Sequence, residues 1–356
     1  MKQPEVQTLT ALRGIMALWV VALHYGHHLA VPIRAPLHIY GFLAVDVFFV
    51  LSGFILYHVH RQALETRRLD MPRFLLRRLA RLYPVHLVTM LAALAIVAAA
   101  DAAGQSATLG FRLDTALGDL WANLALVHGL NTVDALRLNY PSWSISTEMA
   151  AYVAFPAVAA AVLALPRRWA PTLAALSFLL MTLVWETFGR AATGDRALWS
   201  LTLEWSILRI APEFLMGAAF ARAFCDREIE IRFWQVALLV VLMLGALQLH
   251  APMVFVLATP WLITALFFWR VRVPGPLRWL GLISYSLYMV HALVEMLGFW
   301  SLRVLLDLPA DQAPLWSLPL LTLLAIPLAA ACRAWVELPG HRAVLALAAR
   351  ARLRAA

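Results

Sequence analysis

The sequence predicts an all-α fold: a polytopic bundle of about ten transmembrane helices with cytoplasmic N and C termini. Three observations lead to this prediction. The 356 residues are 63% hydrophobic and only 14% charged, whereas soluble domains are nearer one half apolar and one quarter charged. Apolar runs of about 20 residues recur along the chain, as they do in transmembrane proteins. Basic residues gather in alternate connections between these runs.

The apolar runs define the candidate spans. They are 8–30, 41–60, 82–103, 142–165, 169–189, 198–221, 233–249, 252–269, 279–299 and 313–333. If every span crosses the bilayer, the connections fall into two sets that face opposite sides. Most basic residues belong to the set that includes both termini, and positive charge marks the cytoplasmic side. The net charge of +9 is therefore mainly a topology signal, and no nucleic-acid partner is expected.

Two segments depart from this regular pattern. Residues 113–130 are marginally apolar, but an eleventh span there would break the charge asymmetry downstream, so we expect an outer-face or re-entrant helix. Residues 1–342 are predicted to form one transmembrane domain. Residues 343–356 are predicted to form a basic cytoplasmic tail that lies along the inner membrane interface.

Ionisable residues inside spans are costly and usually face a cavity or a partner. His24, Asp46 and Glu148 each lie about five or six residues below a predicted outer helix end. At 1.5 Å per residue, they share a depth of roughly 8–10 Å. This layer favours a functional site in which Asp46 pairs with His24 or with neighbouring donors. The alternative for His24 is a hydrogen bond that only packs helices.

The first span also carries Arg13, eleven residues before His24. Eleven helical steps return to nearly the same face, roughly 16 Å along the axis. His24 and His28 have an i,i+4 spacing that can bind zinc, but no acidic or cysteine ligand is fixed beside them. We therefore predict no metal and interpret these histidines as an interfacial cluster.

The stretch RFLLRRLARLYP, residues 73–84, concentrates arginines at the start of the third span; they are Arg73, Arg77, Arg78 and Arg81. They either anchor the helix on the positive side or, because guanidinium forks match phosphate oxygens, clamp a phosphate group. The chain contains no GxxxxGK[ST], GxGxxG or GxSxG motif. Neither a nucleotide-hydrolysing domain nor a serine hydrolase is indicated.

Taken in order, six motifs resemble those of the acyltransferase-3 family of integral membrane acyltransferases: TALRGIMALWVVALHY, GFLAVDVFFVLSGFIL, RRLARLYP, PSWSISTEMAAYVAFP, LGLISYSLYMVHAL and WVELPGHR. The resemblance spans residues 8–342, and its specificity lies in the ordered set. It implies transfer of an acyl group, commonly acetyl, from cytoplasmic acyl-CoA to a hydroxyl, with no tightly bound cofactor. The implied acceptors are sugars of extracytoplasmic or membrane-associated glycans and glycolipids, or alternatively macrolide-like small molecules.

The resemblance also implies roles for particular positions. These are Arg13 and His24 of the Arg–His motif, the paired Arg78 and Arg81, Glu148 of the Trp-Ser-x-Ser-x-Glu segment, and His291 of the SYxLYxxH segment. MAAY follows the acidic residue where the family has Glu-Gln-Phe-Tyr, a departure that bears on acceptor preference.

These residues predict how the co-substrate binds. Arg77, Arg78, Arg81 and Arg13 would hold the phosphates of acyl-CoA at the inner face of the membrane. A pantetheine arm of roughly 15–20 Å would then bring the thioester to His24, about 16 Å from Arg13 along the helix.

The predicted chemistry centres on His24, which would act as general base on the acceptor hydroxyl. Asp46 or Glu148 would orient this imidazole or stabilise its charged form. A covalent acyl-histidine is the alternative route.

Three further residues are predicted to face the acceptor. Trp143 and Ser146 are expected at the mouth through which it enters, with helix capping and interfacial anchoring as alternatives. His291 is expected nearer the middle of the membrane, and its alternative is a buried hydrogen bond to Ser or Tyr.

Two other functional classes fit buried ionisable residues as well. One is a transporter or flippase that moves an acyl group or lipid without chemistry, and the other is a structural membrane partner in polysaccharide export. Arginine far outnumbers lysine and alanine is abundant, which suggests a GC-rich bacterial gene. The predicted location is therefore the cytoplasmic (inner) membrane of a bacterium, in contact with the lipid bilayer.

Overall fold

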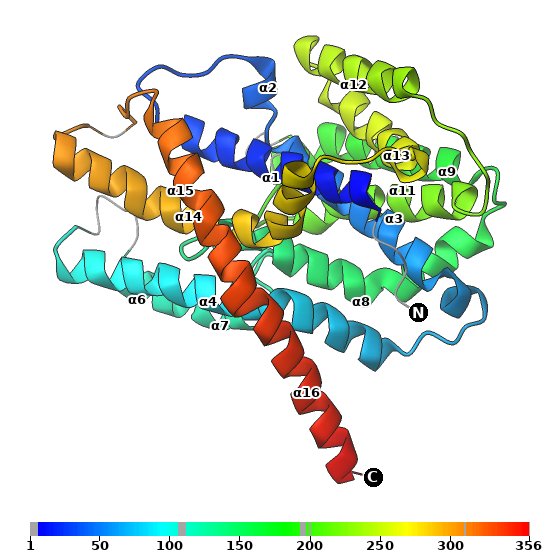
Figure 1. Ribbon diagram of the computed structural model, residues 1–356, viewed down its shortest axis with the longest axis horizontal. Helices are drawn as coiled ribbons and strands as arrows, with labels where there is room; N and C mark the ends of the chain where they lie inside the picture. The colour runs from blue at the N-terminus through cyan, green and yellow to red at the C-terminus, as the bar shows by residue number, and fades with distance from the viewer. Residues whose placement is uncertain (1–5, 106–111, 193–196, 199–200, 310, 356) are drawn as a thin grey trace. The chain divides into compact units, whose positions relative to one another are not determined.

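A computed structural model describes residues 6–105, 112–192, 197–198, 201–309 and 311–355, and it confirms the all-α prediction (Figure 1). Among these residues no β-sheet forms, and one isolated parallel bridge joins Leu29 to Ala313. The chain divides into two compact units. Unit 1 contains residues 1–20, 34–69 and 150–282; unit 2 contains residues 21–33, 70–149 and 283–356.

Seven helical stretches within the described residues are long and apolar enough to cross a membrane. They are Gln7–Gly26, Leu43–Glu65, Met71–Ala102, Tyr140–Ala164, Ala170–Gly189, Gly275–Leu306 and Ser317–Ala351. Large apolar side chains remain exposed along most of them, as expected for lipid-facing surfaces. The chain is therefore a multi-pass membrane protein.

Three more helices coincide with predicted spans but fall short of these criteria. α11 (Ser206–Phe224) contains three charged residues. α12 (Phe233–Gln248) and α13 (Pro252–Phe268) have 16 and 17 residues. At 1.5 Å per residue such helices are about 24–26 Å long, less than the roughly 30 Å of a bilayer core. The count of about ten membrane spans and the cytoplasmic location of both termini therefore stay predictions.

Unit 1 is organised around two parallel helices, α3 (Leu43–Glu65) and α11. Their backbones touch because each carries a glycine at the crossing. A Cβ on Gly53 would collide with the carbonyl of Phe214, and a Cβ on Gly217 with the carbonyl of Val50. Small residues permit this close helix packing inside membranes. The same unit contains α2 (Pro36–Ile39), α9 (Ala170–Val184), α10 (Arg190–Ala192), α12 and α13.

Unit 2 contains α4 (Met71–Ala102), which begins eleven residues before the predicted third span. The helix extends beyond the start of the predicted span because Asp70 caps it. The Asp70 carboxylate accepts a hydrogen bond from the Arg73 backbone N–H at 3.0 Å. The arginine-rich stretch therefore lies within the helix. Unit 2 also contains α15 (Ser317–Cys332) and α16 (Leu338–Ala355), with residues 143–149 of α8 (Trp143–Ala164) and residues 283–306 of α14 (Gly275–Leu306). The rest of α8 and of α14 belongs to unit 1.

The predicted basic tail belongs to a long helix. α15 continues through a π-helical stretch, Arg333–Glu337, into α16, and Figure 1 shows the three as one extended rod. α16 packs on α4, where Gly340 lies against the ring of Pro84.

Residues 113–130 form two short helices, α6 (Leu113–Gly118) and α7 (Leu120–Leu124), neither long enough to cross a bilayer. Both lie along α4. The Tyr83 hydroxyl donates to the carbonyl of Leu124 at 3.1 Å, and His86 Nε2 lies 2.9 Å from the carbonyl of Asn123. Of the two expected forms, this arrangement favours the re-entrant one.

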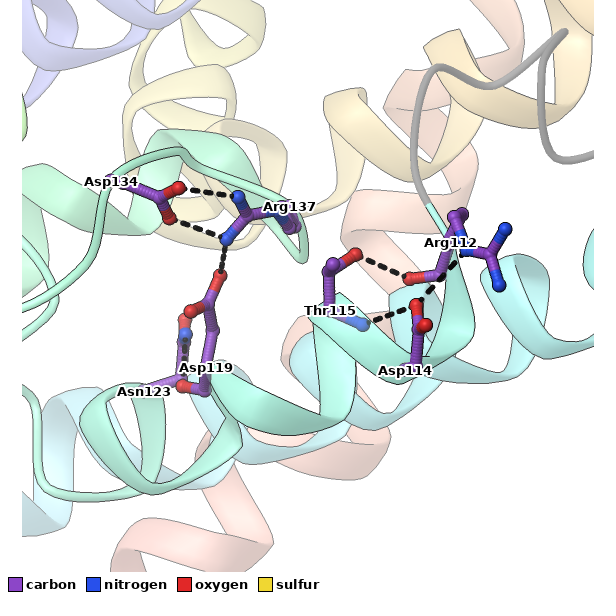
Figure 2. A network of polar contacts seen from close by, with 7 residues as sticks. All are labelled: Arg112, Asp114, Thr115, Asp119, Asn123, Asp134 and Arg137. Atoms are coloured by element: carbon purple, nitrogen blue, oxygen red, sulfur yellow. Dashed lines mark hydrogen bonds and ion pairs between the residues drawn. The ribbon is translucent and has the colours of Figure 1, made fainter.

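An ion-pair cluster fixes the return of this segment toward α8 (Figure 2). The Arg137 guanidinium donates to Asp119 at 2.6 Å and to Asp134 at 2.9 Å. The Arg137 and Asp119 side chains are only 16% and 12% exposed, whereas Arg112 and Asp114 pair nearby at 75% and 65% exposure. The Arg137 hydrogen bond holds the pKa of the Asp134 carboxyl below its ordinary value.

We expect Arg137→Gln to lower the free energy of unfolding by about 1–2 kcal/mol, because Asp119 loses a charged hydrogen-bond partner while partly buried. Thermal unfolding in detergent measures this. Arg112→Gln is the matched control and should change nothing measurable, since its pair is solvent-exposed. The contribution of Asp134 is present above about pH 4 and is lost as the pH falls through its lowered folded-state pKa. Equal effects of the two arginine variants would contradict this prediction.

Candidate active site

Two histidines from distant parts of the chain meet inside unit 2. His24 lies in the last turn of α1 (Gln7–Gly26), and its Nδ1 is 2.9 Å from Nε2 of His291 on α14. Their rings are nearly parallel, at 3°. His291 is fully buried, and Tyr25 donates a hydrogen bond to its backbone carbonyl at 3.0 Å. For His291 the sequence analysis gave a hydrogen bond to Ser or Tyr as the alternative interpretation. The observed side-chain partner is instead the imidazole of His24.

The direction of this hydrogen bond follows from the surroundings of His291. Its Nδ1 is buried and makes no aligned hydrogen bond, while the backbone of Leu287 and Tyr288 in the preceding turn of α14 interacts with its ring. Because a helical side chain lies over the carbonyls three and four residues before it, we assign the His291 proton to Nδ1 and the acceptor role to Nε2. His24 then donates through Nδ1, and its Nε2 holds a lone pair. Within the described residues this nitrogen makes no hydrogen bond.

A carboxylate completes the cluster. Glu295 lies one turn after His291 on α14, and one of its oxygens is within 4.8 Å of a ring nitrogen of His24 and of a ring nitrogen of His291. Its Oε1 is 2.9 Å from Nε2 of His28, and its Oε2 accepts a hydrogen bond from the hydroxyl of Tyr140. The Tyr140 ring also meets His24 edge-on, with centroids 5.0 Å apart.

Two imidazoles and one carboxylate can in principle hold a divalent metal ion, with His24, His291 and Glu295 as ligands. This set differs from the His24 and His28 spacing in the sequence. The donor atoms are already engaged, however, because the imidazoles bind each other and the carboxylate binds His28 and Tyr140. The imidazoles, the carboxylate and the Tyr140 hydroxyl thus form a hydrogen-bonded network, which suits proton transfer.

Residues 6–334 match the model of the acyltransferase domain that defines the acyltransferase-3 family. It belongs to the acyltransferase-3 family. This confirms the resemblance found in the motifs.

Two curated relatives match parts of the chain. Acyltransferase MdmB from Streptomyces mycarofaciens is 37% identical over 163 residues, which are 43% of this chain and 38% of the relative. Protein 2 in picA locus from Rhizobium radiobacter is 40% identical over 91 residues, 26% of this chain and 43% of the relative. The chain thus spans less than half the length of each. No solved structure matches it.

Asp46 has a different partner from the predicted histidine. In unit 1, one Asp46 carboxylate oxygen lies 2.9 Å from Nε of Arg209, and the other lies 2.5 Å from a terminal nitrogen of the same guanidinium. Asp46 also shares a hydrogen bond with Glu213. All three side chains are buried, at 1–2% exposure. Arg209 is thus one of the neighbouring donors that were the alternative to His24.

Glu148 and His24 interact with different parts of α14. Glu148 lies within electrostatic range of the Tyr285 hydroxyl. His24 contacts His291, six residues after Tyr285 and a rise of about 9 Å along the helix. The shared depth of His24 and Glu148 stays a prediction.

The predicted phosphate-binding arginines lie in the first half of α4 and differ in exposure. Arg77 is exposed, whereas Arg78 and Arg81 are half-buried. The Arg78 guanidinium lies over the ring of Phe74, 5.6 Å from its centre. Arg81 is within electrostatic range of Tyr285, as Glu148 is. Half-buried guanidinium groups suit an anion that enters from one end of the helix bundle.

The residues expected at the acceptor mouth are buried, Trp143 at 6% and Ser146 at 0% exposure. The Ser146 hydroxyl donates to the carbonyl of Leu126 at 2.8 Å and accepts from the Gly129 N–H at 3.1 Å. Ser146 thus joins α8 to the end of the 113–130 segment, a structural role that differs from the helix capping and interfacial anchoring given as alternatives.

The sequence analysis missed Glu295, Tyr140, Arg209 and Glu213. Two of them left a signal in the sequence. Glu295 follows His291 at i+4, so both lie on one face of an apolar helix. An intramembrane Asp46 requires a cation, and Arg209 is an arginine within a predicted span.

Proposed function

We propose that the protein is a membrane O-acyltransferase that moves an acyl group, acetyl in the simplest case, from cytoplasmic acyl-CoA to a hydroxyl. The acceptor we propose is an extracytoplasmic or membrane-associated glycan or glycolipid, and the site of action is a bacterial cytoplasmic membrane. Membership of the acyltransferase-3 family supports the acyl transfer itself.

One observation carries the assignment of the base: the 2.9 Å hydrogen bond between His24 Nδ1 and His291 Nε2. With His24 as the donor, this bond leaves a lone pair on Nε2 of His24, as a carboxylate does for the histidine of a catalytic triad. A base with this tautomer can remove a proton from a hydroxyl within hydrogen-bond reach.

The transfer then balances as follows. The acceptor oxygen attacks the thioester carbonyl while its proton moves to Nε2 of His24, and a C–O bond forms. The C–S bond breaks, and the CoA thiolate takes the proton from the imidazolium of His24. The products are an ester and free CoA thiol, and no oxidant or metal is needed for this balance.

The arginines would bind the co-substrate. Arg78 and Arg81, which are half-buried on α4, would bind the CoA phosphates. Arg13 would assist them, and it lies on the same helix as His24, about 16 Å from it along the axis. The length of a pantetheine arm matches this rise. Arg73 is exposed at the start of α4 and serves as a control.

The experiment is release of CoA thiol from acetyl-CoA by purified protein, with glycolipid or macrolide-type acceptors compared. We expect release by the wild type, and a loss of ~10²–10⁴-fold in His24→Gln with its fold retained. Arg78→Gln should raise KM for acetyl-CoA, whereas Arg73→Gln should leave KM nearly unchanged. Wild-type release retained in His24→Gln would remove the proposed base, and transport of acyl groups without thiol release would favour a transporter.

A further inference from the structure

Glu295 is the carboxylate nearest to the histidine pair, and neither the sequence motifs nor the family match assigns it a role. Its side chain is only 14% exposed. One of its oxygens lies within 4.8 Å of a ring nitrogen of each of His24 and His291. At this distance, in a medium from which water is largely excluded, a negative charge interacts strongly with a positive charge on either imidazole.

The acyl transfer creates such a positive charge. When His24 takes the acceptor proton, the His24–His291 pair becomes cationic inside an apolar helix bundle. An isolated charge there is costly unless a partner is already in place. Preorganised charges of this kind stabilise a transition state because they do not have to reorient during the reaction.

The other two candidate carboxylates are engaged elsewhere. Asp46 holds Arg209 in a buried ion pair in unit 1. Glu148 lies near Tyr285, about 9 Å before His291 along α14. The role that the sequence analysis gave to Asp46 or Glu148 therefore fits Glu295.

Two neighbours hold the Glu295 carboxylate in place. The Tyr140 hydroxyl donates to Oε2, and Nε2 of His28 lies 2.9 Å from Oε1. His28 is itself positioned by Asp311, whose Oδ1 is 3.5 Å from Nδ1. With both oxygens engaged, the carboxylate is oriented before any substrate binds.

We infer that Glu295 is a positioning residue of the acyl-transfer site: it stabilises the imidazolium that forms on the His24–His291 pair. The inference rests on the proposed function. It assigns Glu295 neither contact with the acyl group nor transfer of the acceptor proton.

The test measures kcat and KM for CoA release in Glu295→Gln, which keeps the size of the side chain and removes its charge. We expect kcat to fall ~10²–10³-fold, with KM for acetyl-CoA within about threefold of wild type. Glu295→Asp should recover part of kcat. Glu186→Gln is the matched control: a half-buried glutamate paired with Arg190 at 2.6 Å in another helix, expected to stay within about twofold.

Several results would overturn the inference. Wild-type kcat in Glu295→Gln, while His24→Gln is inactive, would refute the role of Glu295 and leave the proposed function standing. A parallel rise in KM and fall in thermal stability, with no recovery in Glu295→Asp, would mark a purely structural residue. A stoichiometric divalent metal, found by elemental analysis and lost in Glu295→Gln, would make Glu295 a ligand. Absence of thiol release by the wild type would refute both proposals together.

Discussion

His291→Phe should lower the turnover of CoA release by ~10²–10⁴-fold while the KM for acetyl-CoA stays close to that of the wild type. Phenylalanine fills the same buried space but cannot accept the hydrogen bond from His24 Nδ1. The His24 proton is then free to move to Nε2, and the lone pair that acts as base is lost from the reacting side. Steady-state kinetics of thiol release measures the effect.

A glutamine at position 291 separates the hydrogen bond from simple packing. Its amide oxygen can reach the position of the lost Nε2 and accept from His24, so His291→Gln should be more active than His291→Phe. The matched control is His86→Gln. His86 is a fully buried histidine of the same unit, stacked on His128 and bonded to the carbonyl of Asn123. It should alter stability without a selective loss of kcat, and equal kinetic losses at positions 86 and 291 would refute the assigned hydrogen bond.

Helix positions followed well from the sequence because the signal is local. Apolar runs of helical length placed a helix in each of the ten predicted spans, since a membrane requires every backbone group to be satisfied within its own segment. The third predicted span began at residue 82, whereas α4 begins at Met71 and includes the arginines 73–81. A helix can extend beyond the hydrocarbon layer wherever a cap such as Asp70 allows it.

The side-chain partners of the buried residues could not be predicted from the sequence, because these partners are distant along the chain. His24 and His291 are joined by a single hydrogen bond across 267 positions of sequence. Depth estimates from helix ends grouped His24 with Glu148, but depth says nothing about which helices are neighbours or how each one is rotated. Glu295 was overlooked although its spacing of four residues from His291 places both on one helix face, and its contacts with Tyr140 and His28 are visible only in the structure.

The buried ion pair of unit 1 gives the largest expected effect on stability. Arg209→Met should lower the free energy of unfolding by about 3–5 kcal/mol, because Asp46 is then left charged and buried without its partner. Arg209 also donates to the carbonyls of Leu201 and Phe42, both at 3.3 Å, so the start of α11 loses further hydrogen bonds. Thermal unfolding in detergent, followed by size-exclusion chromatography, measures the loss.

Removing both charges tests whether the loss arises from the unpaired carboxylate. Asp46→Asn combined with Arg209→Gln should recover much of the lost stability, because a neutral buried pair that can still hydrogen-bond carries no uncompensated charge. Arg190→Met is the control at a partly exposed pair, where the Arg190 and Glu186 side chains are 36% and 28% exposed, and should cost about 0–1 kcal/mol. A double variant no more stable than Arg209→Met would mean that α3 and α11 depend on the arginine's backbone contacts instead. If the double variant were stable and still released CoA, Asp46 would be a structural residue, and the chemistry would belong to the histidine pair of unit 2.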